Sequence, residues 1–260
     1  MSEPRVLVLR APGTNCDIET AGAFERAGGA PDMLHLYRLF ESPQTLHDYR
    51  ILAIPGGFSY GDDVAAGAVV AAELRSKLLP DLERFVEGGG LILGICNGFQ
   101  ILVKAGLLPA LGGLGSRGDL TLGWNDSGRY EDRWVTLRVE SDKSPFFRKG
   151  DLIDCPVAHA EGKVVVRDPS VVDRLREAGQ IVVTYEAADG GEAAYPENPN
   201  GSIAGIAGVC DPTGRVMGLM PHPERNVDGT HHPRWTRDGI EVGGAGLRVF
   251  EDAVKHAASV

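Results

Sequence analysis

The sequence predicts an α/β protein with a single domain, in which a mostly parallel central sheet is flanked by helices and extended by extra antiparallel strands. In the first half of the chain, short apolar runs alternate with helical patterns, and these runs are apolar throughout rather than at every second position. Strands of that kind are buried on both faces, as in a parallel sheet covered by helices. In the second half, strand-like runs follow one another through turns, which favours antiparallel pairing or additions at the sheet edge. We expect one domain over residues 1–260.

The expected elements follow from these patterns in chain order. Four apolar runs predict the strands of the first half, over residues 6–9, 33–36, 51–54 and 91–95. Helical spacing of apolar side chains predicts helices over residues 17–27, 62–79 and 97–105, with a further short helix that begins at Pro80. Later runs predict strands over residues 134–139, 152–157, 181–185, 203–209 and 216–220, and a final helix over residues 247–257. Residues 226–244 are polar and contain glycine, which predicts an extended loop.

The composition argues against several classes of protein. The formal net charge is −10, from 26 Lys and Arg against 36 Asp and Glu, so a nucleic acid would meet net repulsion. The four cysteines form no C-x-x-C pair, unlike those of disulfide-rich secreted domains or zinc ribbons. Cys155 and Cys210 fall in predicted core strands, and Cys16 lies in a glycine loop, where a core position or a supporting one near a site is expected. No apolar run approaches the length of a membrane span or a signal peptide. We therefore expect a cytoplasmic protein with no nucleic-acid or membrane partner.

A junction between a strand, a cysteine and a helix gives the clearest indication of chemistry. The apolar run of residues 91–95 ends at Cys96, a helical pattern begins at once, and Gly94 and Gly98 flank the cysteine. G-x-C-x-G is the cysteine form of the nucleophile elbow, a sharp turn that needs glycines because neighbouring chain passes close by. A helix N-terminus also favours a thiolate. We interpret Cys96 as a nucleophile, and a buried structural cysteine is the alternative.

A histidine and a carboxylate that could serve this nucleophile follow a later apolar run. His222 and Glu224 lie two residues apart, and the prolines beside them disfavour helix, so both side chains point to the same side of an extended chain. The imidazole would exchange protons with the thiol, and the carboxylate would orient the imidazole. Alone, such a pair is more often an exposed turn. Together with Cys96 it predicts a Cys–His–Glu triad.

Acyl transfer from an amide also needs backbone N–H groups that stabilise the developing oxyanion. The elbow supplies one at Asn97, directly after the nucleophile. A second donor is expected at Gly57, in the Pro-Gly-Gly-Phe-Ser segment of residues 55–59, which follows a predicted neighbouring strand. Pro-Gly-Gly alone is weak evidence, and a plain tight turn is the alternative.

Together these three segments resemble the triad class, or class I, of glutamine amidotransferases, in which a Pro-Gly-Gly loop, a G-x-C-x-G-x-Q elbow and a His-Pro-Glu strand end occur in this order. The likeness covers nearly the whole chain and is most specific to the glutaminase subunits of phosphoribosylformylglycinamidine synthase. The segments that carry it are residues 11–17 (APGTNCD), 56–62 (GGFSYGD), 96–100 (CNGFQ), 159–162 (HAEG) and 221–225 (PHPER). Residues 226–244 depart from the family, because this loop is longer than its compact bacterial form requires.

The resemblance implies a role for each matching residue. They are Cys96 as nucleophile, His222 as general base and acid, Glu224 as the group that orients the imidazole, Gly57 and Asn97 as oxyanion donors, and Gln100 as a ligand of the substrate glutamine. The loop of residues 159–161 would contact the α-carboxylate of glutamine through its backbone.

The activity that the resemblance implies is hydrolysis of glutamine to glutamate and ammonia. The ammonia would pass to a large synthetase subunit, which uses ATP to convert formylglycinamide ribonucleotide to its amidine in purine biosynthesis, and a small accessory subunit is also expected. ATP and magnesium would be bound by the synthetase, since this chain contains neither a G-x-x-x-x-G-K-[ST] loop nor a G-x-G-x-x-G after a strand. We therefore expect no cofactor and no metal in this chain.

Three alternatives stay open at this point. An elbow-type cysteine hydrolase of similar fold would act on another substrate and would not need Gln100. A degenerate domain kept as a scaffold would not need an intact triad. A metal site could combine His222 with His231, His232 and a cysteine, but adjacent histidines point to opposite sides of an extended chain, so a solvated loop is the simpler interpretation.

Overall fold

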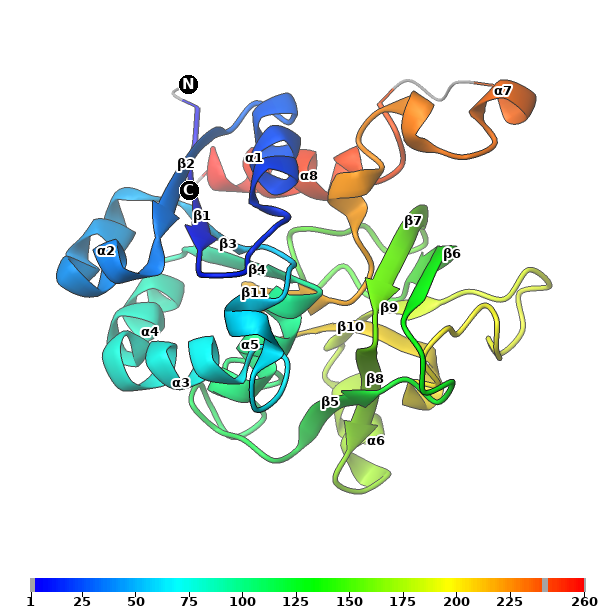
Figure 1. Cartoon of the computed structure of the whole chain (residues 1–260), viewed down its shortest axis with the longest axis horizontal. Helices are drawn as coiled ribbons and strands as arrows, with labels where there is room; N and C mark the ends of the chain where they lie inside the picture. The colour runs from blue at the N-terminus through cyan, green and yellow to red at the C-terminus, as the bar shows by residue number, and fades with distance from the viewer. Residues whose placement is uncertain (1–2, 240–242, 260) are drawn as a thin grey trace.

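The computed structural model describes residues 3–239 and 243–259 and shows a layered α/β fold (Figure 1). Its strands are β1 (Arg5–Arg10), β2 (Ala30–His35), β3 (Ile51–Ile54), β4 (Leu91–Ile95), β5 (Leu120–Trp124), β6 (Glu131–Val139), β7 (Leu152–His159), β8 (Glu161–Val166), β9 (Ile181–Tyr185), β10 (Ile206–Cys210) and β11 (Val216–Leu219). Its α-helices are α1 (Asp17–Arg26), α2 (Leu36–Glu41), α3 (Ala68–Lys77), α4 (Leu79–Glu87), α5 (Asn97–Ala105), α6 (Ser170–Glu177), α7 (Trp235–Asp238) and α8 (Leu247–Ala257). Its 3-10 turns are η1 (Pro43–Asp48), η2 (Ser59–Asp62), η3 (Ile203–Gly205), η4 (Pro223–Arg225) and η5 (Gly229–His231).

One mixed sheet organises the fold, in the strand order β2-β1-β3-β4-β11-β10-β9-β6-β7. From β2 to β11 all neighbouring strands are parallel, and from β11 to β7 all are antiparallel. The predicted single-domain α/β fold, with a mostly parallel sheet and antiparallel additions, is confirmed. One strand differs from expectation, because β11 comes from the second half of the chain but pairs in parallel with β4. A separate antiparallel pair joins β5 and β8.

The pairing of β4 with β11 brings two distant segments to the same edge of the sheet. Ile95 at the end of β4 lies opposite Leu219 at the end of β11. Cys96 follows the first strand directly, and His222 follows the second within a few residues. Ligand sites of parallel sheets lie beyond the carboxyl ends of the strands, so this edge is where a site is expected.

Helices cover both faces of the parallel half (Figure 1). On one face lie α1 and α8, where the rings of Phe24 and Phe250 meet edge to face with centroids 5.0 Å apart. On the other face lie α3, α4 and α5. Every residue of β3 and β4 is buried, which explains their unbroken apolar runs, since side chains on either face enter a core. Within residues 3–239 and 243–259, no helix is long and apolar enough to span a membrane.

The helix expected over residues 62–79 is wrong at its start, because α3 begins only at Ala68. Asp62 and Val64 have φ angles of 56° and 71°, and Gly67 has 72°. These angles lie in the left-handed region, which a right-handed α-helix cannot contain. The apolar spacing predicts the helix itself correctly, whereas the strained segment before it belongs to the site described below.

Other differences concern short elements. The strand expected over residues 203–209 begins at Ile206, because Ala204 has a φ of 52° and lies in η3. The sequence patterns do not predict α2, β5, β8 or α6, which are too short for a clear apolar periodicity. The loop expected over residues 226–244 contains η5 and α7, and its residues 240–242 lie outside the described residues.

Candidate active site

Cys96 lies at the junction of β4 and α5, as predicted. Its backbone has φ 53° and ψ −105°, a conformation that a residue other than glycine adopts only under strain. The N–H of Cys96 donates to the carbonyl of Leu219 at 2.8 Å, which fixes the junction to the end of β11. The thiol Sγ lies 3.8 Å from the carbonyl oxygen of Ala158 on β7. The strained turn therefore holds the thiol at a helix N-terminus, as a nucleophile elbow does.

The glycines on either side of Cys96 are required by close packing. A Cβ on Gly98 would lie 1.9 Å from the carbonyl oxygen of Ile54 on β3. A Cβ on Gly94 would lie 2.7 Å from the backbone of Gly98, so the two glycines face each other across the turn. The prediction that neighbouring chain passes too close for a side chain is confirmed.

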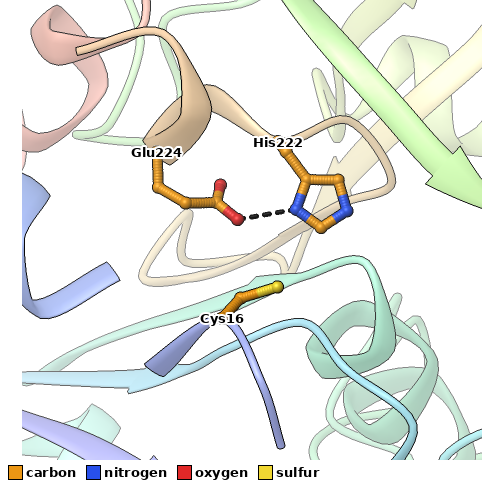
Figure 2. Close-up of side chains that lie close together, drawn as sticks. All are labelled: Cys16, His222 and Glu224. Carbon is orange, nitrogen blue, oxygen red and sulfur yellow. Dashed lines mark hydrogen bonds and ion pairs between the residues drawn. The ribbon is translucent and has the colours of Figure 1, made fainter. Parts of the chain in front are cut away.

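His222 and Glu224 form a buried pair (Figure 2), and the imidazole lies near the elbow, because a Cβ on Gly56 would meet both His222 and Cys96. Nδ1 of His222 lies 2.6 Å from Oε1 of Glu224, and the side chains are 2% and 0% exposed. Glu224 lies in the turn η4 rather than in extended chain, and the N–H of His222 donates to the carbonyl of Pro156 on β7 at 2.8 Å. The carboxylate and imidazole thus meet as expected, but a 3-10 turn brings them together.

The charges around His222 favour its protonated form. Burial lowers the pKa of the imidazole, but the Glu224 carboxylate and the Cys96 thiol raise it by more, so that it lies well above its ordinary value. The second ring nitrogen, Nε2, points away from Glu224 (Figure 2) and is buried without a hydrogen-bond partner among the described residues. An imidazolium in this position stabilises negative charge on the sulfur of Cys96. The pair is therefore suited to nucleophilic attack followed by proton transfer.

The Pro-Gly-Gly loop lies against the triad. A Cβ on Gly56 would come 2.8 Å from Cε1 of His222 and 3.5 Å from Cβ of Cys96, so only glycine leaves room for the imidazole. Gly57 has φ 147° and forms a β-bridge with Thr14, and a Cβ there would meet backbone atoms at 2.8 Å. Gly57 lines the same cavity as Cys96, as an oxyanion donor must.

Asn97 and Gln100 tie the elbow to its surroundings. The side chain of Asn97 donates to Oε1 of Gln100 at 2.9 Å and accepts from the N–H of Ser59 at 3.4 Å. Nε2 of Gln100 donates to the carbonyl of Glu161 at 2.5 Å. The N–H of Asn97 has no acceptor within α5, because it belongs to the first turn, which leaves it for an oxyanion. Gln100 lines the cavity, but both polar atoms of its side chain are already bound within the protein.

A cavity of about 480 Å³ opens beside Cys96, between α5, β5, the Pro-Gly-Gly loop and the β7–β8 connection. This volume suits a small molecule. A larger cavity of about 830 Å³, between α3, α5 and β5, shares only Lys104 and Thr121 with it. No triad residue lines the larger cavity, so the smaller one is the candidate substrate site.

The HAEG segment forms a tight connection rather than the expected loop, because Ala160 alone separates β7 from β8. His159 is buried here, with Nδ1 3.1 Å from Oδ1 of Asn125, and a Cβ on Gly162 would lie 2.4 Å from its ring. Burial, and then the charge of His222, lowers the pKa of His159 to about 3. His159 therefore stays neutral at physiological pH and shapes the cavity wall rather than acting as a base.

Cys16 lies beside the imidazole (Figure 2). Its Sγ, a ring nitrogen of His222 and a carboxylate oxygen of Glu224 all lie within 4.8 Å of one another. Burial raises the pKa of the Cys16 thiol, and the nearby imidazole of His222 lowers it in part. This is the supporting position near the site that the sequence left open. Cys155 and Cys210 are fully buried in β7 and β10, as predicted.

The same three side chains are, within the described part of the chain, the group that could hold a metal ion. Nη2 of Arg225 lies 3.2 Å from Sγ of Cys16, so a positive charge already occupies this position. The ring nitrogen Nδ1 and the oxygen Oε1 are taken up by their mutual hydrogen bond. His232 lies elsewhere, with Nε2 3.8 Å from a carboxylate oxygen of Asp154. The arrangement favours proton transfer over metal binding.

The structure brings the six predicted site residues to one end of the sheet. They are Cys96, His222, Glu224, Gly57, Asn97 and Gln100. Sequence reasoning missed Asp62 and Lys104, which also line the cavity. A signal for Lys104 was present, because it lies two helical turns after Cys96 on the face that also carries Gln100.

Comparisons with known proteins agree with this geometry. A family model described as the CobB/CobQ-like glutamine amidotransferase domain matches residues 3–257. Phosphoribosylformylglycinamidine synthase subunit PurQ of Dehalococcoides mccartyi is 48% identical over 262 residues, which cover 100% of each chain. The subunit of the same name from Archaeoglobus fulgidus is 42% identical over 268 residues, which cover 98% of this chain and 97% of the relative.

Solved structures show the same relationship. A chain in the structure of PurLQS from Thermotoga maritima matches with a TM-score of 0.74 and 35% identity, over 97% of this chain and 98% of that one. A glutamine amidotransferase from the same organism matches with a TM-score of 0.53 and 16% identity, over 98% of this chain and 91% of that one, which shows a shared fold alone.

Proposed function

The chain belongs to the family of PurQ subunits of phosphoribosylformylglycinamidine synthase, and from this premise we propose that it hydrolyses the side-chain amide of glutamine to glutamate and ammonia. The observation that carries the proposal is the buried His222–Glu224 pair near the strained Cys96, which lines a cavity of about 480 Å³. An elbow-type hydrolase acting on another substrate is not favoured, because the relatives match over the whole chain.

In the first half of the proposed reaction, the thiolate of Cys96 attacks the carbonyl carbon of the glutamine side chain. The negative charge moves to the carbonyl oxygen, where the N–H groups of Gly57 and Asn97 stabilise it. Protonated His222 then donates its Nε2 proton to the departing nitrogen, which leaves as ammonia. A γ-glutamyl thioester on the sulfur remains.

In the second half, water enters from the side of the cavity. Neutral His222 removes a proton from the water, which attacks the thioester carbonyl, and the same N–H groups stabilise the second oxyanion. The carbon–sulfur bond breaks and glutamate leaves. Glu224 holds the imidazole so that Nε2 faces the sulfur and stabilises the imidazolium each time it forms.

We further propose that the ammonia passes to a large synthetase subunit, with a small accessory subunit in the same complex, and is used to convert formylglycinamide ribonucleotide to formylglycinamidine ribonucleotide. Support comes from the matching chain in the PurLQS structure. We propose that ATP and magnesium are bound by the synthetase, and that this chain carries no cofactor. A cytoplasmic location is proposed as well, since all four cysteines are free thiols, which suits a reducing compartment.

The test is glutamate release from glutamine, measured for the purified chain alone and with the cognate synthetase subunits, ATP and formylglycinamide ribonucleotide. We expect release that rises strongly in the complete mixture. Cys96→Ala should reduce release to background in the same mixture. Cys210→Ala, which removes an equally buried thiol from β10, should leave it unchanged.

The outcome that contradicts the proposal is a folded wild-type chain that releases no glutamate under any of these conditions. Retention of glutamate release by Cys96→Ala would contradict the assignment of the nucleophile while leaving the activity in place.

A further inference from the structure

Lys104 places a positive charge in the wall of the cavity beside Cys96. It lies on α5 two turns after the nucleophile, on the face that carries Gln100, and long helical side chains point back toward the helix N-terminus. Its Nζ is buried and has no hydrogen-bond partner among the described residues. By contrast, Lys77 and Lys163 each reach a carboxylate, at 3.6 and 2.5 Å. A buried ammonium without a partner is costly, so a ligand that pairs with it would be bound tightly.

Two carboxylates line the same cavity, those of Asp62 and Glu161. Asp62 follows the Pro-Gly-Gly loop, and its φ of 56° is a strained conformation for a residue other than glycine. Nδ2 of Asn97 donates to Oδ1 of Asp62 at 3.4 Å, which links this carboxylate to the elbow. Strain of this kind is found where a side chain must be held at a functional position.

The cavity wall therefore carries both signs of charge. Burial lowers the pKa of Lys104, and the charges of Glu161 and Asp62 raise it in part. Burial raises the pKa of Asp62, as does Glu161, while Lys104 lowers it. The charged form of each group is thus stabilised by a neighbour of opposite charge, but this does not fully offset burial when no ligand is bound.

Glutamine offers matching charges. Its reacting amide carries none, whereas its α-carbon, a few bonds away, bears a carboxylate and an ammonium group. We propose, resting on the glutaminase activity proposed above, that Lys104 binds the α-carboxylate of glutamine and Asp62 binds its α-ammonium group, so that these two residues select free glutamine over other amides. Gln100, whose side chain is bound within the protein, then positions Glu161 in the cavity wall.

The proposal is tested by ammonia release in the complete complex, with three substrates that share the same amide. L-Glutamine carries both charged groups, glutaramate lacks the α-ammonium group, and γ-aminobutyramide lacks the α-carboxylate. In the wild type we expect kcat/KM to fall by about 10- to 100-fold for each group removed, because each contact is a hydrogen bond to a charged group.

Two isosteric variants then assign the contacts. Lys104→Met should lower kcat/KM for L-glutamine and glutaramate by about 10- to 100-fold and leave γ-aminobutyramide within about threefold. Asp62→Asn should lower kcat/KM for L-glutamine and γ-aminobutyramide by a similar factor and leave kcat/KM for glutaramate unchanged. The matched controls are Lys255→Met and Asp63→Asn, at exposed positions outside the cavity. They should leave kcat/KM unchanged for all three substrates.

If a variant lowered kcat/KM equally for all three substrates, the proposal would be overturned. A merely structural effect does not depend on which charge the substrate carries. If a variant fails to fold, the wild type alone tests the subsite. Wild-type turnover of γ-aminobutyramide and glutaramate as fast as that of glutamine would contradict the subsite, while the glutaminase activity would remain supported. A wild type that releases ammonia from none of the three would contradict the proposed function itself.

Discussion

The buried His222–Glu224 pair can be tested with Glu224→Gln, which keeps the size of the side chain and an oxygen that accepts a hydrogen bond but removes the charge. Nδ1 of His222 lies 2.6 Å from Oε1 of Glu224. Because both side chains are buried, salt and water screen their interaction little. Burial lowers the pKa of His222, and the Glu224 carboxylate is the main group that opposes it. Without that charge, the pKa of His222 should fall, so that fewer molecules carry the proton that His222 donates to the leaving nitrogen.

The magnitude follows from the type of contact. A hydrogen bond to a charged group contributes about 1.5–3 kcal/mol, and each ~1.4 kcal/mol is a factor of about ten in rate. The imidazolium carries positive charge until it gives up its proton, and Glu224 stabilises that charge, so we expect kcat for glutamate release to fall by about 10- to 100-fold in the variant. KM should stay within about threefold, because Glu224 does not line the cavity.

Stability should depend on pH in a defined direction. The folded-state pKa of His222 is raised, so its contribution is fully present below the unfolded-state value of about 6.5 and is lost as pH rises through the folded-state value. The difference in unfolding free energy between wild type and Glu224→Gln should therefore be larger at about pH 6 than at about pH 10. Denaturant unfolding at both values measures it.

Glu177→Gln, at an exposed position on α6, is the control and should change neither rate nor stability. A Glu224→Gln variant with full kcat, and with an unfolding free energy equal to that of the wild type at about pH 6, would show that the Glu224 charge does not stabilise the His222 imidazolium.

Three further changes test other parts of the site. In a denaturant titration, Gly98→Ala should lower the unfolding free energy by about 3 kcal/mol or more, because its Cβ would meet the β3 backbone. The control is Gly22→Ala in α1, which has open space around it and should leave the unfolding free energy unchanged or slightly raised. Cys16→Ala should keep glutamate release within about tenfold of the wild type, since its thiol supports the triad without attacking the substrate. Gln100→Leu should cost about 1–3 kcal/mol of stability and raise KM for glutamine, because it leaves buried polar partners unpaired; an unchanged KM would contradict its part in the cavity wall.

The elbow was predictable because its sequence signals are local. Flanking glycines, an apolar strand and a helical pattern determine the position of Cys96 without knowledge of the rest of the chain. The approach of His222 is different in kind. It depends on β11 inserting in parallel beside β4, a pairing between segments more than a hundred residues apart in the sequence. The His-Pro-Glu motif predicted that His222 serves Cys96, whereas only the order of strands in the sheet explains how the two side chains come together.

The local pattern gives the wrong backbone at Asp62, whereas at Lys104 it gives the right helix face and leaves the burial of the side chain open. The stretch before α3 has apolar residues at helical spacing, yet its backbone is left-handed at Asp62 and Val64, which the spacing does not predict. Lys104 reads as an ordinary polar position near the end of an amphipathic helix, and its burial depends on β5, a strand too short and mixed to predict. The charges of the cavity are therefore a tertiary property.

The central claim is that Cys96 forms a covalent intermediate with glutamine. Rapid acid quenching of the complex during turnover, followed by mass spectrometry of its peptides, tests this most directly, because a thioester survives acid. We expect one γ-glutamyl group on the peptide that contains Cys96 and none after Cys96→Ala. A γ-glutamyl group on Cys16 instead, or glutamate release with no modified cysteine at any time point, would contradict it.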